Sequence, residues 1–150
     1  MTSFHYRFDK VLDLREQERD ETEMAYKEAI EEFEKVAIQL YDQMKKKENI
    51  LEEQQQRMTT GFSIDDLHHY SRFITTLDVT IDHIQQEVMK SRSKMNWYET
   101  QLLEKNIEVK KFEKMKEIGK EQHNAEMEHV EANRIDELST MKFRSKEDGW

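Results

Sequence analysis

A heptad pattern of apolar residues runs through the second half of the chain and constrains the fold more than any other feature. From Leu67 to Phe112 the positions follow alternating steps of three and four, and only Ser91 and Lys105 are polar. A pattern sustained over this many heptads is typical of a coiled coil. The positions are Leu67, Tyr70, Ile74, Leu77, Ile81, Ile84, Val88, Ser91, Met95, Tyr98, Leu102, Lys105, Val109 and Phe112.

The composition agrees with long helices that share a narrow apolar seam. Charged residues make up 38% of the chain and hydrophobic residues 35%, so a thick core cannot be filled. The net charge of −9 argues against a free-standing nucleic-acid binder, because phosphate contacts need a basic face. The chain has no cysteine and no apolar run of about 20 residues, which is the length needed to cross a bilayer. We expect a cytoplasmic protein that meets other proteins, without direct transmembrane insertion.

The first half of the chain carries a looser pattern with helical spacing. Arg15, Lys47 and Gln54 interrupt this seam, and its period drifts, so the hand of a supercoil cannot be assigned. The apolar members are Phe4, Phe8, Val11, Ala25, Ala29, Phe33, Val36, Leu40, Met44, Leu51 and Met58.

Between the two patterns, four local signals predict a tight turn near residues 59–63. Gly61 can adopt the left-handed conformation that ends a helix. Ser63 is a good N-cap, and Asp66 three residues later resembles a capping box. Phe62 and Leu67 then occupy the positions at which a hydrophobic staple forms.

A short turn makes the two helices antiparallel neighbours, in which paired residue numbers add up to about 123. In this register Lys45–Lys47 lie opposite Asp78 and Asp82. A second basic stretch lies opposite acidic residues of the first helix. It consists of Lys105, Lys110, Lys111, Lys114 and Lys116, and the acidic residues are Asp9, Asp13, Glu16 and Glu18.

The predicted fold is all-α: a long antiparallel two-helix coiled-coil hairpin with a longer second helix. We expect one domain over residues 1–150, with helices over about 4–59 and about 64–145. The second helix then extends beyond its partner as an overhang over about 120–145, some 40 Å long at about 1.5 Å per residue. The alternative is a parallel dimer of nearly straight chains, which does not explain why the seam fades opposite residue 4.

The sequence offers little for catalysis. Glu126 and His129 have the spacing used in di-iron bundles, but such sites need further carboxylates from other helices, and a solvated surface pair is the alternative. Adjacent His68 and His69 point apart on a helix, and no phosphate loop, nucleophile elbow or zinc motif is present. We expect no enzyme activity, no metal and no cofactor.

Apolar residues beside the seam are candidates for binding. Near the turn these are Ile38, Tyr41, Phe73 and Val79, which either widen the core or form a binding patch. Trp97 is also off the seam and is either an anchor or a cover for its neighbours. On the overhang, a new stripe of apolar residues begins. This segment is either a frayed tail or a helix that docks in a groove of another protein. The stripe consists of Met127, Val130, Ile135, Leu138 and Met141.

Three segments together resemble the flagellar export protein FliJ family. The opening FHYRFDKVLDLREQERDETEMAYKEA is similar to the start of that family. The stretch YSRFITTLDVTIDHI, residues 70–84, is similar to its segment after the turn, and EANRIDELSTMKFR, residues 131–144, to its C-terminal signature. The resemblance covers nearly the whole chain, and related proteins of virulence-type secretion systems share the architecture.

The resemblance implies a soluble stalk of the type III export apparatus at the cytoplasmic side of the cell membrane. Implied partners are the hexameric export ATPase and its regulator, export chaperones, and the cytoplasmic domain of the membrane export gate. The overhang stripe would contact the ATPase ring. The region near the turn, with Ile38, Tyr41, Phe73 and Leu77, would face the gate. Two rivals stay open: a holdase-type chaperone for unfolded export substrates, and a parallel-dimer scaffold.

Overall fold

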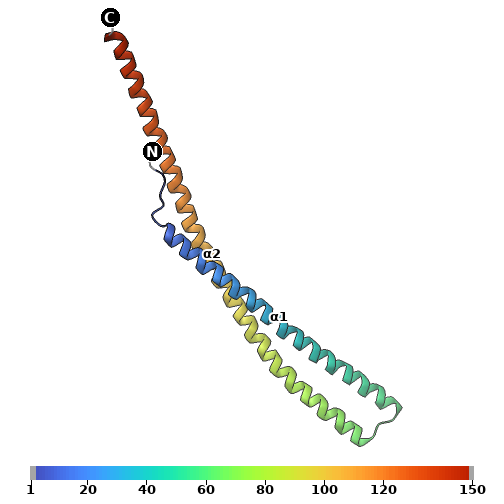
Figure 1. Cartoon of the computed structure of the whole chain (residues 1–150). Helices are drawn as coiled ribbons and strands as arrows, with labels where there is room; N and C mark the ends of the chain where they lie inside the picture. Colours follow the sequence, from blue (N-terminus) through green and yellow to red (C-terminus); the bar gives the residue numbers. More distant parts are fainter. Residues whose placement is uncertain (1–2, 149–150) are drawn as a thin grey trace. The chain divides into compact units, whose positions relative to one another are not determined.

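A computed structural model describes residues 3–148 and contains two α-helices in that range. Helix α1 spans Asp9–Thr60 and helix α2 spans Ile64–Asp148, with 52 and 85 residues. The chain reverses direction between them, and the helices lie side by side (Figure 1). The predicted all-α hairpin with a longer second helix is therefore confirmed, and the parallel dimer of straight chains is not the fold. Of the expected domain 1–150, residues 1–2 and 149–150 lie outside the described residues.

The turn has the predicted local structure. Gly61 has a φ of 122°, a region that side chains with a Cβ rarely adopt, and its N–H donates to the carbonyl of Arg57 at 3.1 Å. The Ser63 hydroxyl accepts a hydrogen bond from the Asp66 N–H at 3.2 Å and so caps α2. The predicted staple differs: the Phe62 ring stacks on Tyr70 with centroids 5.6 Å apart, whereas Leu67 is 39% exposed.

Helix α1 begins at Asp9, later than the predicted start near Phe4. The Asp9 N–H donates to the carbonyl of Tyr6 at 3.2 Å, and the Tyr6 hydroxyl donates to the carbonyl of Phe112 at 3.1 Å. The segment before α1 is therefore not helical, and it brings the buried Tyr6 ring against α2. Phe4 packs over Gly119, where an added Cβ would lie 3.4 Å from the ring.

The chain divides into two compact units, each with a segment of both helices. One unit consists of Met1–Arg19 and Lys105–Trp150, and the other of Asp20–Glu104. In the first, Tyr6, Leu12 and Val109 form the buried core, with Phe4 and Phe112 packed against it. In the second, the heptad residues of α2 supply most of the buried side chains. They are Tyr70, Leu77, Ile81, Ile84 and the polar Ser91, with Ala29 from α1.

Ion pairs within each unit confirm the antiparallel register. In the first unit, Lys105 reaches Glu18 at 3.5 Å and Lys116 reaches Asp9 at 2.9 Å. In the second, Lys47 pairs with Asp78 at 2.5 Å. The sequence predicted pairs of this kind, but Lys110, Lys111 and Lys114, which it also placed opposite acidic residues of α1, form no ion pair within the described residues. Partly exposed pairs of this type set orientation more than stability.

The seam of α1 differs from the predicted one close to the turn. Met44, Leu51 and Met58 are exposed, whereas Gln43, Lys47, Ile50 and Gln54 are partly buried. The predicted positions 47 and 54 are correct, and positions 43 and 50 replace the predicted 44 and 51. Met58 has no partly buried neighbour in α1, because residues 55–60 are all exposed. Because polar side chains fill much of this part of the seam, methionine and leucine are left on the surface.

Candidate functional site

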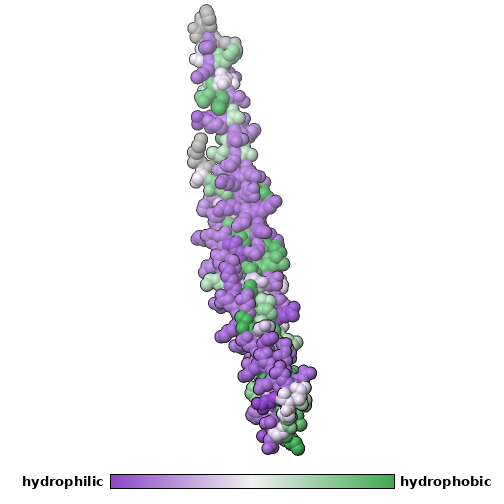
Figure 2. Space-filling model, turned by 90° about the vertical axis from the view of Figure 1, so that its right-hand side faces the viewer, coloured by the Kyte–Doolittle hydropathy of each residue, from purple (hydrophilic) through white to green (hydrophobic). Residues whose placement is uncertain are grey.

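The surface of the hairpin is mostly hydrophilic, with separate hydrophobic areas between the charged residues (Figure 2). Three such places combine large apolar side chains with an accessible position. They are the stripe on the C-terminal part of α2, the off-seam residues near the turn, and a hollow between the helices at the turn.

The C-terminal part of α2 presents the overhang stripe. Val130, Ile135, Leu138 and Met141 are all exposed, whereas Met127 is partly buried. Their spacing places them within one broad side of the helix. The exposed Phe143, which sequence reasoning missed, lies away from that side. The sequence feature that could have identified Phe143 is an aromatic residue within a charged tail.

A contact between the N-terminal segment and α2 lies just before this stripe. The Phe4 ring is 5.6 Å from the His123 ring, and Phe4 also covers Gly119. Four residues beyond His123 the stripe begins. The stripe therefore belongs to a part of α2 that follows the packed core of its unit.

Near the turn, the four predicted gate-facing residues do not share one environment. Ile38 and Tyr41 are exposed on α1, and Phe73 is partly exposed on α2. Leu77, in contrast, is only 5% exposed and lies in the buried seam. Its side chain is therefore not part of the exposed patch.

Phe73 has a basic neighbour from the other helix. The ammonium group of Lys46 lies 5.6 Å from the centre of the Phe73 ring, within the range of a cation–π contact. Tyr41 lies five residues before Lys46 on α1. Because Lys46 contacts Phe73, Tyr41 and Phe73 lie at neighbouring positions along the length of the hairpin. The off-seam Val79 is also exposed.

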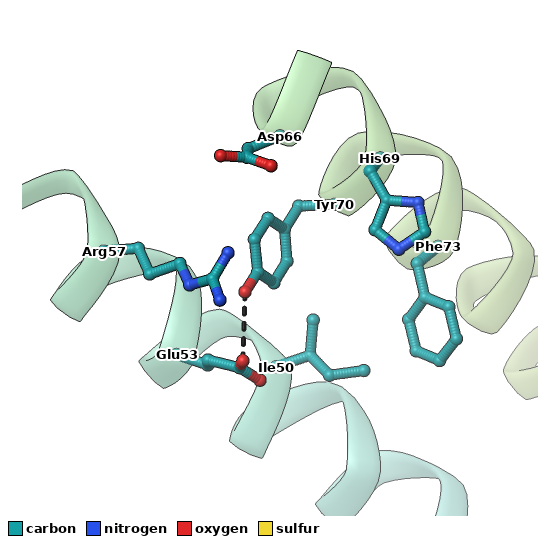
Figure 3. A pocket seen from close by; sticks show the side chains of 7 residues that line it. All are labelled: Ile50, Glu53, Arg57, Asp66, His69, Tyr70 and Phe73. Atoms are coloured by element: carbon teal, nitrogen blue, oxygen red, sulfur yellow. Dashed lines mark hydrogen bonds between the residues drawn. The ribbon is translucent and has the colours of Figure 1, made fainter. Parts of the chain in front are cut away.

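A hollow of about 320 Å³ opens between the helices beside the turn (Figure 3). Side chains of both helices point toward it. From α1 they are Ile50, Glu53 and Arg57, and from α2 they are Asp66, His69, Tyr70 and Phe73. Sequence reasoning missed this hollow, because it depends on which residues of α1 lie opposite Tyr70.

Tyr70 forms the centre of the hollow. Its hydroxyl donates to the Glu53 carboxylate at 3.0 Å, and the Arg57 guanidinium lies 6.0 Å from its ring centre. Burial raises the pKa of the Tyr70 phenol above its ordinary value, and the hydrogen bond to Glu53 raises it further. The phenol therefore stays protonated near neutral pH and serves as a donor that holds the two helices together.

The chemistry of the hollow fits binding better than catalysis. The Tyr70 hydroxyl and the Glu53 carboxylate are hydrogen-bonded to each other, and the exposed Phe73 connects the apolar wall to the outer surface. A partner could place an apolar side chain against Ile50 and Phe73, with Glu53, Asp66 and Arg57 around it.

Two histidines of α2 make surface contacts. His83 meets Glu87 at 3.2 Å, and the His129 ring lies 3.4 Å from the Asn133 amide. Among the described residues, no group of three histidine, aspartate or glutamate side chains could hold a metal ion. Trp97 is exposed and packs edge-on against Tyr98, with ring centroids 4.9 Å apart.

Neither helix, over the residues described, has a stretch apolar and long enough to cross a bilayer. This finding agrees with the hydrophilic character of the printed sequence.

Comparisons with known proteins give one consistent result. The family model described as "Flagellar FliJ protein" matches residues 4–148. The Flagellar FliJ protein of Bacillus subtilis (strain 168) is 38% identical over 141 residues, which cover 94% of this chain and 96% of that protein. No solved structure matches the chain significantly. The match spans the turn, both helices and the C-terminal stripe, and the chain therefore belongs to the flagellar FliJ protein family.

Proposed function

We propose that this protein is a non-catalytic component of flagellar protein export. In this proposal it links the export ATPase ring to the cytoplasmic domain of the membrane export gate and assists export chaperones. Family membership supports the flagellar export role. The observation that carries the link is the exposed apolar stripe of α2, which follows the packed core at the Phe4–His123 contact.

The overhang stripe is the proposed contact with the ATPase and its regulator. Large apolar side chains at helical spacing are what a helix uses when it docks in a groove. Val130 and Leu138 are half exposed in this structure, at 54% and 49%, so their burial by a partner would release water from apolar surface.

The turn-proximal surface is the proposed contact with the export gate. Ile38 and Tyr41 offer exposed apolar area on α1, and Phe73 offers an aromatic edge on α2 beside the hollow. Leu77 is buried in the seam one turn of α2 after Phe73, so its role in this proposal is to hold α2 in place and not to touch the gate. The protein would lie at the cytoplasmic face of the membrane at the flagellar base, without spanning it.

A coupling role requires more than two binding surfaces. Each partner must favour one state of the complex, so that binding at one surface changes the free energy of binding at the other. Length alone does not supply this difference. The coupling is therefore measured as the change in affinity for the gate domain when the ATPase is bound.

The first experiment mixes the purified protein with the cognate export ATPase and follows co-elution and the rate of hydrolysis. We expect that Val130→Asp with Leu138→Asp weakens the complex by about ten-fold or more, since two anchors become charged. The matched control is Met24→Asp with Met89→Asp, two exposed methionines in the unit Asp20–Glu104. A chain that ends after residue 120 is a second test of the same stripe.

Three outcomes are informative. Loss with the stripe variant alone supports the ATPase contact. Equal loss with the control variant, at unchanged helicity, shows that no particular surface is used. If the unchanged protein neither binds nor stimulates the ATPase, the ATPase role is wrong.

A holdase-type chaperone is the second candidate function. The observation in its favour is the number of large apolar side chains exposed along both helices, among them Met24, Tyr41, Met89 and Trp97. A holdase would bind many unfolded chains and would depend little on Val130 and Leu138. Suppression of aggregation by the stripe variant at the level of the unchanged protein would support it.

A further inference from the structure

A further apolar surface lies on α2 on the side that faces away from α1. Within the unit that contains Lys105–Trp150, Ile107, Met115 and Ile118 are exposed, whereas Val109 is fully buried. Residues 107, 111, 115 and 118 are separated by three or four positions and so share one side of the helix. We call Ile107, Lys110, Lys111, Lys114, Met115 and Ile118 the basic outer face.

The basic outer face is hollowed. A shallow depression that is largely open to solvent is lined by Ile107, Lys110, Lys111, Lys114 and Met115. The aliphatic stems of lysine side chains commonly cover apolar surface while the ammonium groups stay in water. The walls of this hollow are therefore apolar near the helix and positively charged at the rim.

The three lysines of this face differ from the other lysines nearby on the same helix. Lys105 and Lys116 pair with Glu18 and Asp9 of α1. No ion pair or hydrogen bond within the described part of the chain engages Lys110, Lys111 or Lys114. They form a local positive group in a chain whose net charge is −9.

We propose that the basic outer face docks an acidic amphipathic helix of another protein. An apolar side chain of that helix would enter the hollow between Ile107 and Met115, and its flanking carboxylates would meet Lys110, Lys111 and Lys114. Helix-in-groove recognition reads apolar anchors at this spacing, and opposite charges set partner choice and register. The surface is separate from the overhang stripe and from the turn-proximal patch, so it does not depend on the proposed function.

A hollow with apolar walls favours a protein helix over a lipid surface. A protruding side chain fills such a hollow, whereas a bilayer surface offers no fixed side chain for it. A second copy of this chain is also disfavoured, because two copies would bring three lysines against three lysines in a symmetric pairing.

The test uses the full chain and a synthetic helical peptide of about 20 residues, with leucines at spacings of three and four and flanking glutamates. A matched peptide carries lysines in place of the glutamates. Fluorescence anisotropy measures both affinities at two salt concentrations. We expect the glutamate peptide to bind about ten-fold tighter or more, and its affinity to fall as salt rises.

The variant Lys110→Glu/Lys111→Glu/Lys114→Glu should lose about ten-fold or more of this binding. The control Lys90→Glu/Lys120→Glu/Lys142→Glu has the same net charge and alters exposed lysines outside the face. Ile107→Ser/Ile118→Ser keeps the charges and should also weaken binding. Circular dichroism verifies that each variant keeps its helix content.

Four results would overturn the proposal. They are absence of peptide binding, equal binding of the two peptides, equal loss in the control variant, and binding to anionic phosphatidylglycerol vesicles without peptide binding. Sedimentation measurements add a further condition. A dimer of the unchanged protein that the triple variant abolishes would show that a second copy occupies the face.

Discussion

Helix α2 carries an apolar stripe in each of two regions, and the two stripes meet different surroundings. Between Tyr70 and Ser91 the stripe is buried against α1, and Leu77 is 5% exposed. Between Val130 and Met141 the stripe is exposed, and Leu138 is 49% exposed. The residue types are alike, so the difference comes from the segment that lies opposite. An apolar stripe thus predicts that a helix has a partner, but not whether the partner belongs to the same chain.

The largest expected effect tests this comparison directly. Leu77→Ala should lower the free energy of unfolding by about 2–4 kcal/mol, because it removes buried methyl groups and leaves a cavity. Leu138→Ala should change it by less than about 0.5 kcal/mol. Urea denaturation followed by circular dichroism measures both. Equal losses would mean that the overhang stripe is covered in the free protein.

Gly61→Ala should come next in size. The φ of 122° is strained for any residue with a Cβ, although nothing lies within 4 Å of an added Cβ. We expect a loss of about 1–2 kcal/mol from backbone strain alone. The same denaturation measurement checks it, and Gly61→Asn should recover part of the loss. An unchanged midpoint for Gly61→Ala would show that the turn adopts another conformation in solution.

Tyr6→Phe should have a smaller effect, in the packed core that precedes the exposed stripe within the same unit. It removes the hydrogen bond to the Phe112 carbonyl and keeps the ring, so we expect a loss of about 1 kcal/mol. Hydrogen exchange of the amides around Phe112 is the more local measurement, and it should become faster. The matched control is Tyr41→Phe, whose exposed hydroxyl has no hydrogen bond within the described structure. Equal effects of the two variants would contradict the role of Tyr6.

The smallest expected effect depends on pH. The hydrogen bond from Arg15, together with the charges of Lys105 and Arg15, holds the pKa of Glu18 below its usual value. A lowered pKa in the folded state contributes stability above the unfolded pKa, and this is lost as pH falls through the folded pKa. Glu18→Gln should therefore lower the thermal midpoint slightly near pH 7. The difference from the unchanged protein should shrink as pH falls through the lowered folded pKa of Glu18 and disappear at more acidic pH. A difference that persists at acid pH would mean that the carboxylate charge is not its cause.

The heptad residues and the turn could be predicted from sequence because their signals are local. The heptad spacing from Tyr70 to Phe112 indicates which side of α2 is buried. Gly61 and Ser63 mark the end of one helix and the start of the next. The start of α1 could not be predicted in this way. Tyr6 does not continue the heptad, and its burial depends on a hydrogen bond to a residue on the other helix.

The candidate surfaces divide in the same manner. The exposure of Val130 and Leu138 could be predicted, because in the antiparallel register α1 is too short to lie opposite them. The hollow beside Tyr70 does not, because Glu53 and Arg57 have no sequence signal that assigns them to it. Leu77 shows the converse: its place in the heptad indicated burial, while the family resemblance suggested a surface contact. In the structure its heptad position decides its exposure.

The contact between Phe4 and Gly119 has a mechanical consequence for α2. Glycine is the weakest helix former apart from proline, so an uncovered glycine is where a long helix bends most easily. Here an aromatic ring lies against that glycine and takes the place of the side chain it lacks. Phe4 thus supports α2 at Gly119. Removal of Phe4 would uncover this glycine, and α2 would bend more easily there, just ahead of the stripe that is proposed to bind the ATPase.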